Sequence, residues 1–276
     1  MQHVINGVKL HWRESGAGDD VVLFIHGFPF RSTMWGPQLE AVPQGWRYIA
    51  PDLRGFGSSE AGSEPFSMDL FADDVIALLD HLNIEQVVIC GLSMGGYVAL
   101  SIAERYPHRM RAVVLAATRA SADSPDARKA RHELAARTRA QGSMVVVESM
   151  LPKLVSGATS LHRPEVADFV RVMMQTTNAE VIARALEALA SRNDYRDKLH
   201  LINVAAAVVR GDQDEIISRE DADHLARAIR GAKYDLIPNV GHLPNLEAPD
   251  VFNKTLDTFL RSLPAPISIR DMTFIF

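Results

Sequence analysis

The sequence contains a single cysteine, Cys90, among its 276 residues. An intramolecular disulfide therefore cannot form, and the usual cysteine-containing zinc sites are excluded. Basic residues are not in excess either, because 29 lysines and arginines stand against 34 acidic residues and give a net charge of −5. Since proteins that bind nucleic acid normally carry a basic patch, this composition gives no reason to expect a nucleic-acid partner.

Long hydrophobic runs are missing as well. No apolar stretch approaches the ~20 residues that span a bilayer, and residues 1–7 lack the basic and apolar regions of a secretory signal. These absences predict a cytoplasmic protein with no membrane partner. The proportions of apolar residues (47%) and charged residues (23%) are ordinary for a globular chain with a sizeable core, and the length suits one α/β domain with an insertion.

Buried strands and helices are predicted to alternate over residues 1–118. Asn6-Gly7 lies between two apolar runs and predicts a β-hairpin at residues 3–12. Further strands are predicted where short apolar runs occur, at 21–25, 47–50, 86–90 and 110–116. Helices are predicted between them, near 33–42, at 68–82 and at 97–105. This order is typical of an α/β fold with a mainly parallel sheet flanked by helices.

The composition changes at about residue 119. Between 119 and 200, Ala, Arg, Glu and Met recur at helical spacing, and the one apolar run that suits a strand, 145–147, fits a helix equally well. We therefore expect a helical cap at 119–200, inserted into a core domain formed by 1–118 and 201–276. The sheet pattern then resumes, with strands predicted at 204–209 and 233–237 and helices at 219–229 and 249–263.

The C-terminal segment 264–276 is unusually apolar, and 267–270 and 273–276 have the composition of strands. A loose apolar strand is an aggregation hazard. We therefore expect this segment to pack on its own domain or to meet a second copy of the chain, and both a monomer and a homodimer stay open.

The most informative motif is Gly91-Leu92-Ser93-Met94-Gly95, a G-x-S-x-G pattern between a predicted buried strand and a predicted helix. A serine on such a sharp turn is forced into strained backbone angles that lift its hydroxyl clear of the sheet. Glycine is needed on either side because the strand and the helix lie too close for a side chain. The first N–H groups of the helix point at the same place and favour negative charge there.

A serine hydroxyl needs a general base and a third group that orients this base. Such groups are expected after other strands, because the carboxyl ends of parallel strands gather along one crevice. Two segments qualify: Gly211-Asp212-Gln213-Asp214 follows one predicted strand and Gly241-His242 follows another. Both aspartates are available as the acid, and the chain order Ser, Asp, His is the one expected for such a site.

Together these motifs resemble those of the α/β-hydrolases. Within that family, the sequence resembles the small carboxylesterases and the 3-oxoadipate enol-lactonase-like enzymes. The resemblance rests on five segments that follow one another in order along nearly the whole chain: His26-Gly27-Phe28-Pro29, Asp52-Leu53-Arg54-Gly55-Phe56-Gly57-Ser58-Ser59, Gly91-Leu92-Ser93-Met94-Gly95-Gly96, Gly211-x-x-Asp214 and Gly241-His242. It implies an α/β-hydrolase fold, which is a mainly parallel twisted sheet flanked by helices, with an inserted helical cap.

The resemblance also implies catalytic roles. Ser93 would be the nucleophile, His242 the general base and Asp214 the acid that orients it, since the family places this acid three residues after the glycine. The backbone N–H groups of Phe28 and Met94 would form the oxyanion hole. No metal or cofactor is required by this set.

An apolar, adaptable substrate pocket is expected where the cap lies over the site. The cap supplies apolar side chains at helical spacing: Met144, Met150, Phe169, Met173 and Met174. Combined with side chains from the strand-end loops, they give a proposed pocket lining of Phe30, Trp35, Met144, Met173 and Leu243. Methionines at this spacing are also typical of a helical core, so their role depends on how the cap docks.

The implied function is hydrolysis of carboxylic esters or lactones of small, largely apolar molecules through an acyl-enzyme. Three alternative activities use a similar triad, namely carbon–carbon bond hydrolysis, perhydrolysis and proline-directed aminopeptidase activity. A further alternative is a non-catalytic ligand receptor on the same fold. Haloalkane dehalogenase chemistry is disfavoured because it needs a carboxylate where Ser93 stands.

Overall fold

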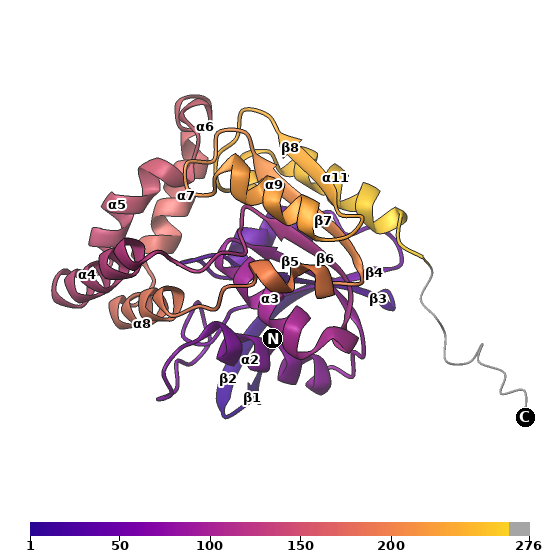
Figure 1. The fold of residues 1–276 in the computed structure, drawn as a ribbon. Coiled ribbons are helices and arrows are strands. Elements are labelled where there is room, and N and C mark those ends of the chain that lie inside the picture. The colour runs from indigo at the N-terminus through magenta and orange to yellow at the C-terminus, as the bar shows by residue number, and fades with distance from the viewer. Residues whose placement is uncertain (265–276) are drawn as a thin grey trace, which may run out of the picture.

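The computed structural model describes residues 1–264, which contain an eight-stranded sheet in the order β1-β2-β4-β3-β5-β6-β7-β8 (Figure 1). Its strands are β1 (Gln2–Ile5), β2 (Val8–Gly16), β3 (Asp20–Ile25), β4 (Trp46–Pro51), β5 (Val87–Leu92), β6 (Met110–Ala116), β7 (Ala205–Gly211) and β8 (Lys233–Ile237). β2 is antiparallel to β1 and β4, and the remaining pairings are parallel. The mainly parallel sheet predicted from the sequence is confirmed.

The two turn residues between β1 and β2 explain why the chain forms a hairpin there. Asn6 has a φ of 47° and Gly7 a φ of 79°, the left-handed values that a two-residue turn between twisted strands requires. Ile5 and Val8 pair directly across the turn. The predicted β-hairpin is therefore confirmed.

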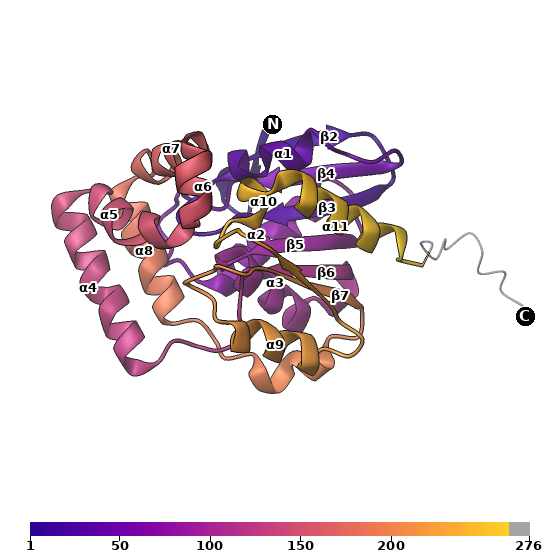
Figure 2. The ribbon, with the colours of Figure 1, turned by 90° about the horizontal axis from the view of Figure 1, so that it is seen from above.

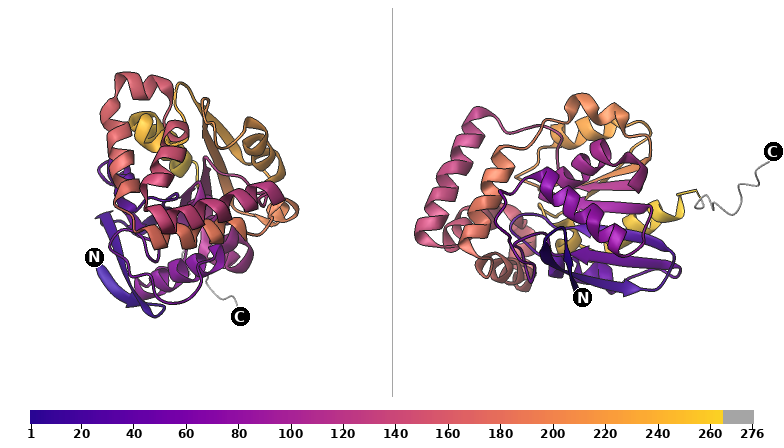
Figure 3. Two further views of the ribbon diagram at one scale, coloured as in Figure 1. Left: turned by 90° about the vertical axis from the view of Figure 1, so that its left-hand side faces the viewer. Right: turned by 90° about the horizontal axis from the view of Figure 1, so that it is seen from below.

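Helices cover both faces of the sheet (Figures 2 and 3). The flanking helices are α1 (Gly36–Leu39), α2 (Met68–His81), α3 (Met94–Arg105), α9 (Arg219–Ala228), α10 (Pro244–Glu247) and α11 (Pro249–Arg261). α2 and α3 pack together on one face, and α1, α10 and α11 form a group on the other. Central strands such as β5 are buried along their whole length because both of their faces are covered.

Five further helices follow one another between β6 and β7. They are α4 (Pro125–Gln141), α5 (Met144–Leu154), α6 (Gly157–His162), α7 (Pro164–Gln175) and α8 (Ala179–Ala190). α4 packs against α8, and the group gathers at the left of Figure 1, beside the sheet. We call these helices the helical segment 125–190; it contains the run 145–147, which lies in α5.

The structure differs from the prediction of one helix near 33–42. It has a 3₁₀ turn, η1 (Ser32–Trp35), followed by the single turn of α1. Pro37 explains the break, because proline has no N–H to donate and is tolerated only in the first turn of a helix. Further 3₁₀ turns occur at η2 (Pro107–Arg109) and η3 (Arg196–Leu201).

Two sequence-based expectations concern membranes and the C-terminal segment. None of the helices in residues 1–264 has the length and apolar character needed to span a bilayer. The strands predicted at 267–270 and 273–276 lie outside the described residues. Their packing therefore stays a prediction.

Candidate active site

Ser93 lies at the turn between β5 and α3, with a φ of 54° and a ψ of −112°. Residues other than glycine rarely adopt these angles, and they do so where the surroundings hold them. Here the Ser93 N–H donates to the Ala116 carbonyl at 2.9 Å, and the Thr118 hydroxyl donates to the Ser93 carbonyl at 2.9 Å. The strained turn predicted from the motif is present.

The glycines on either side of Ser93 are required by close backbone contacts. A Cβ atom at Gly91 would overlap the carbonyl oxygen of Gly95, and a Cβ at Gly95 would overlap the carbonyl oxygen of Ile25. Backbone atoms cannot move aside as a flexible side chain can. Glycine therefore lets β5, α3 and β3 approach closely enough to present the serine.

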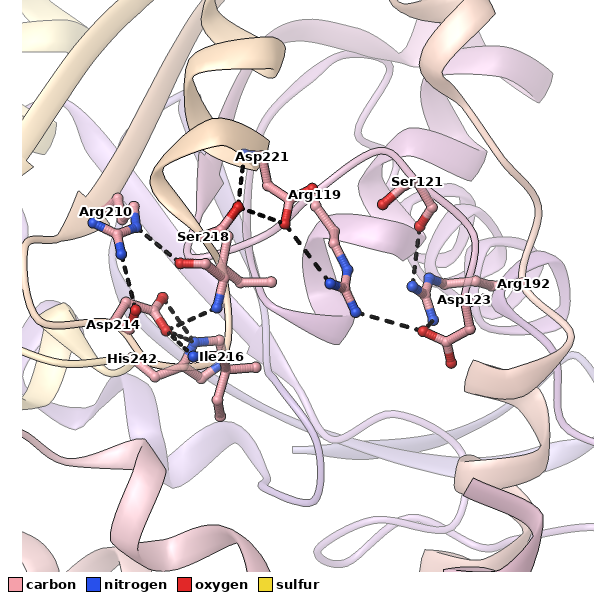
Figure 4. Close-up of polar contacts among 11 residues, drawn as sticks. Arg119, Ser121, Asp123, Arg192, Arg210, Asp214, Ile216, Ser218, Asp221 and His242 are labelled. Atoms are coloured by element: carbon pink, nitrogen blue, oxygen red, sulfur yellow. Dashed lines mark hydrogen bonds and ion pairs between the residues drawn. The ribbon is translucent and has the colours of Figure 1, made fainter. Parts of the chain in front are cut away.

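His242 and Asp214 form a buried pair in the loops that follow the neighbouring strands β8 and β7 (Figure 4). The Nδ1 atom of His242 lies 2.9 and 3.0 Å from the two carboxylate oxygens of Asp214. Because an ionised carboxylate only accepts hydrogen bonds, Nδ1 carries the proton and Nε2 is left as an acceptor. Asp212, the other candidate acid, is exposed.

The loop that carries Asp214 is held by three hydrogen bonds, all of which Asp214 accepts (Figure 4). Asp214 accepts from the N–H groups of Ile216 at 2.8 Å and Ile217 at 3.0 Å, while Arg210 donates to the Asp214 carbonyl at 2.8 Å. Burial alone would raise the pKa of Asp214, but His242 and the two N–H donors outweigh it and lower this pKa. The carboxylate of Asp214 is therefore ionised at neutral pH.

A second buried carboxylate, Glu247, holds the loop that carries His242. It accepts from the N–H groups of Gly241 at 2.9 Å and Leu243 at 3.2 Å, which flank the histidine. Its other oxygen accepts from the N–H of Ser156 in the helical segment 125–190 at 2.8 Å. Glu247 therefore ties the histidine loop to this segment.

Ser93 and His242 line one small cavity of about 40 Å³. At roughly 10–15 Å³ of such space for each water, it holds only a few waters. Side chains from the strand-end loops, from α3 and from the helical segment complete its lining: Phe28, Met94, Tyr97, Arg119, Arg131, Met150, Leu189 and Ile216. A substrate larger than a few atoms must therefore displace part of this lining.

The amide groups expected to form an oxyanion hole are near this cavity. Phe28 and Met94 both line it, and neither of their N–H groups donates a hydrogen bond within residues 1–264. The loop of Phe28 is supported by the buried side chain of His26, whose Nδ1 donates to the Gly27 carbonyl at 2.9 Å. Its Nε2 accepts from the Leu53 N–H at 3.0 Å. Burial lowers the pKa of His26 to about 4, so this side chain is neutral.

The cavity lining does not include the five side chains proposed for the pocket. Trp35 is fully buried between Phe24 of β3 and Phe252 of α11, so it belongs to the core. Met144 is 38% exposed at the start of α5. The others, Phe30, Met173 and Leu243, are completely buried.

Sequence reasoning did not identify several residues that line the cavity: Tyr97, Arg119, Arg131, Leu189 and Ile216. The position of Tyr97 in the site could have been predicted, because it lies one helical turn after Ser93 on α3. Arg119 also follows the end of a buried strand, as Ser93 and Asp214 do. Arg131 and Leu189 had no such signal, because their positions depend on how the helical segment docks.

The described residues offer no evident metal site. Within 1–264, no group of three or more His, Cys, Asp or Glu side chains is arranged to hold a metal ion.

Residues 20–249 match the alpha/beta hydrolase fold family. The chain is 29% identical over 255 residues to 3-oxoadipate enol-lactonase 2 of Acinetobacter baylyi, which covers 92% of this chain and 94% of that protein. The fold implied by the sequence motifs is confirmed.

Two of the solved structures that resemble this chain each cover 95% of it. A thermophilic esterase from Thermogutta terrifontis, solved with malate bound, is 35% identical, with a TM-score of 0.92 and coverage of 95% of this chain and 98% of that one. The enol-lactonase from Burkholderia xenovorans LB400 is 30% identical, with a TM-score of 0.88 and coverage of 95% and 100%. The resemblance to esterases and enol-lactonases is confirmed.

Proposed function

This chain belongs to the α/β-hydrolase fold family and acts on ester bonds, and from this premise we propose that it is a serine hydrolase of carboxylic esters or lactones. In this proposal Ser93 is the nucleophile, His242 the general base and Asp214 its partner. One observation carries it. The Nδ1–H of His242 is bound by both oxygens of Asp214, and the ring lines the same cavity as the strained Ser93.

Acylation begins when the Ser93 hydroxyl attacks the carbonyl carbon while Nε2 of His242 takes its proton. The positive imidazolium that forms is stabilised by the ionised Asp214 beside it. His242 then gives the proton to the leaving alcohol or ring oxygen, the carbon–oxygen bond breaks, and an acyl-serine ester remains.

The negative oxygen of the tetrahedral intermediate needs donors that carry no other hydrogen bond. The N–H groups of Phe28 and Met94 satisfy this condition, and Met94 begins α3, whose positive dipole end favours the same charge. A water activated by His242 then attacks the acyl-serine ester. The acid leaves and Ser93 regains its proton.

We assign the helical segment 125–190 the role of a cap over this site. Arg131 of α4, Met150 of α5 and Leu189 of α8 support this role, because they line the same cavity as Ser93. The cavity is too small for an ester of ordinary size, so the cap or its side chains must move to admit substrate.

The test is steady-state hydrolysis of p-nitrophenyl acetate, butyrate and octanoate, together with a panel of lactones. We expect multiple turnovers for the wild type, and a loss of about 10⁴-fold or more in kcat for Ser93→Ala. Ser63→Ala changes an exposed loop serine and serves as the matched control. Turnover that persists in a folded Ser93→Ala protein would rule out the serine mechanism, and one slow turnover at most would indicate a receptor.

A further inference from the structure

Five charged side chains lie together beside the candidate site, and two of them line its cavity. We call them the arginine cluster: Arg119, Asp123, Arg131, Arg192 and Asp221. Arg119 follows β6 at the edge of the sheet where the site residues gather, and Arg131 belongs to α4. Figure 4 shows Arg119 between Asp221 and Asp123, with Asp214 and His242 nearby.

Asp123 makes close ion pairs with two of the arginines. Its completely buried carboxylate accepts from Nε of Arg131 and lies 2.7 Å from a terminal nitrogen of Arg192. Burial favours the neutral acid, yet the hydrogen bond and charge of Arg131 and the charge of Arg192 hold the pKa of Asp123 below its ordinary value. The charges of this group are therefore fixed at neutral pH.

Arg119 is paired much more loosely. Its terminal nitrogens lie 3.5 Å from Asp123 and 3.7 Å from Asp221, longer than a charge-assisted hydrogen bond. Its Nε, like that of Arg192, is buried and has no hydrogen-bond partner among the described residues. A guanidinium is charged at any physiological pH. The side chain is 24% exposed and lines the cavity of Ser93.

The arginine cluster thus holds three positive charges against two negative ones, and the excess lies with Arg119. A half-buried guanidinium whose two ion pairs are this long is costly unless a further anion completes its hydrogen bonds. Building on the function proposed above, we propose that Arg119, assisted by Arg131, binds a carboxylate of the substrate, distant from the bond that is cleaved. The substrates are then anionic esters or lactones, such as half-esters of dicarboxylic acids.

A carboxylate fits this position for geometric reasons. The planar guanidinium offers parallel N–H donors to two oxygens at once, which a neutral amide or hydroxyl cannot match. A cationic ester would instead add a fourth positive charge to the arginine cluster. The site therefore selects by charge as well as by size.

The experiment compares the monomethyl esters of succinic, glutaric and adipic acid with the methyl esters of the matching ω-amides, which have the same size and no charge. Each rate is divided by the uncatalysed rate. We expect a kcat/KM at least about tenfold higher for the carboxylate than for the amide at one or more chain lengths.

Substitutions then test whether Arg119 is responsible for the preference for a carboxylate. Arg119→Gln is expected to lower the ratio of kcat/KM for the carboxylate to kcat/KM for the amide about tenfold. Arg119→Lys is expected to lower it less, because lysine keeps the positive charge but loses the parallel N–H donors of the guanidinium. Arg137→Gln removes the same charge from an exposed position of α4 and is expected to leave the ratio unchanged. A purely structural role for Arg119 would lower the thermal stability and leave the ratio unchanged.

A binding measurement separates this proposal from the proposed function. Calorimetric titration of the Ser93→Ala protein with glutarate requires no turnover, and we expect binding that Arg119→Gln abolishes. If no ester is hydrolysed but glutarate binds in this way, the serine mechanism fails and the carboxylate site stands. A wild-type ratio near one together with no glutarate binding would overturn the carboxylate site, even if Arg119→Gln does not fold.

Discussion

Ser93 occupies backbone angles that glycine adopts more easily than any other residue, and hydrogen bonds from three elements hold it there. Its N–H bonds to β6, and its carbonyl accepts from Thr118 and from the N–H of Gly96 in α3. The orientation of the hydroxyl is thus achieved at the expense of stability. Such strain is typical of residues whose position matters for chemistry.

This strain gives a prediction at the residue scale. We expect Ser93→Gly to be more stable than Ser93→Ala by about 1 kcal/mol, because glycine relieves strain of roughly 1–3 kcal/mol and loses part of that gain to its greater unfolded-state entropy. Urea unfolding of the two inactive variants measures the difference. Equal stabilities would mean that the turn is not strained.

At the scale of elements, the loop of His242 and the helical segment 125–190 share one anchor. Glu247 bonds the N–H groups of Gly241, Leu243 and Ser156, and the His242 N–H donates to the Leu154 carbonyl at 3.0 Å. The end of α5 and the base are therefore positioned together. Displacement of the segment at this point would disturb His242.

Glu247→Gln tests this anchor. The glutamine NH₂ would face an N–H donor where a carboxylate oxygen now accepts, so we expect a loss of about 1–3 kcal/mol in the free energy of unfolding. We also expect kcat for the best ester to fall about tenfold, since the general base is less well placed. Denaturant unfolding and steady-state kinetics provide the two measurements. Glu148→Gln, an exposed change on α5, is the control, and kinetics that match it would refute the positioning role.

At the scale of the whole molecule, buried His26 links stability to pH. The folded protein keeps it neutral to a pH of about 4, because burial lowers its pKa, whereas the unfolded chain takes up this proton near pH 6.5. The unfolded state therefore binds more protons between these values. The free energy of unfolding falls as the pH is lowered from about 6.5 to about 4, by up to roughly 3 kcal/mol from this group.

The measurement is urea unfolding of the wild type and of His26→Asn between pH 7 and pH 4. We expect the dependence on pH to be shallower in the variant, and unchanged in His132→Asn, which replaces an exposed histidine of α4. Parallel curves for the wild type and His26→Asn would show that His26 is not the group responsible.

The sequence predicted those features that local chemistry controls. Asn6-Gly7 specifies a hairpin turn wherever it lies between two strands, and the glycines around Ser93 identify a close strand–helix approach. Topology predicted that His242 lies near the loop after β7, because both segments follow parallel strands, whereas the resemblance to the α/β-hydrolases singled out Asp214 over Asp212. None of these features depends on how distant segments dock.

Features that depend on docking were not predictable. Trp35 is an apolar residue in a strand-end segment, and only the position of α11 shows that it is enclosed in the core instead of facing the cavity. Arg119, which follows a strand, and Arg131, which belongs to the helical segment, line the same cavity, and no periodicity in the sequence reveals this. We expect the substrate preference of the site to depend on Arg119 and Arg131.

The most direct test of the central claim is mass spectrometry of the protein after reaction with an organophosphonate fluoride, which forms a stable adduct with an activated serine. We expect one adduct per chain, located at Ser93, absent in Ser93→Ala and formed far more slowly in His242→Gln. An adduct at another residue, or equal labelling of Ser93→Ala, would contradict the assignment of Ser93 as the nucleophile.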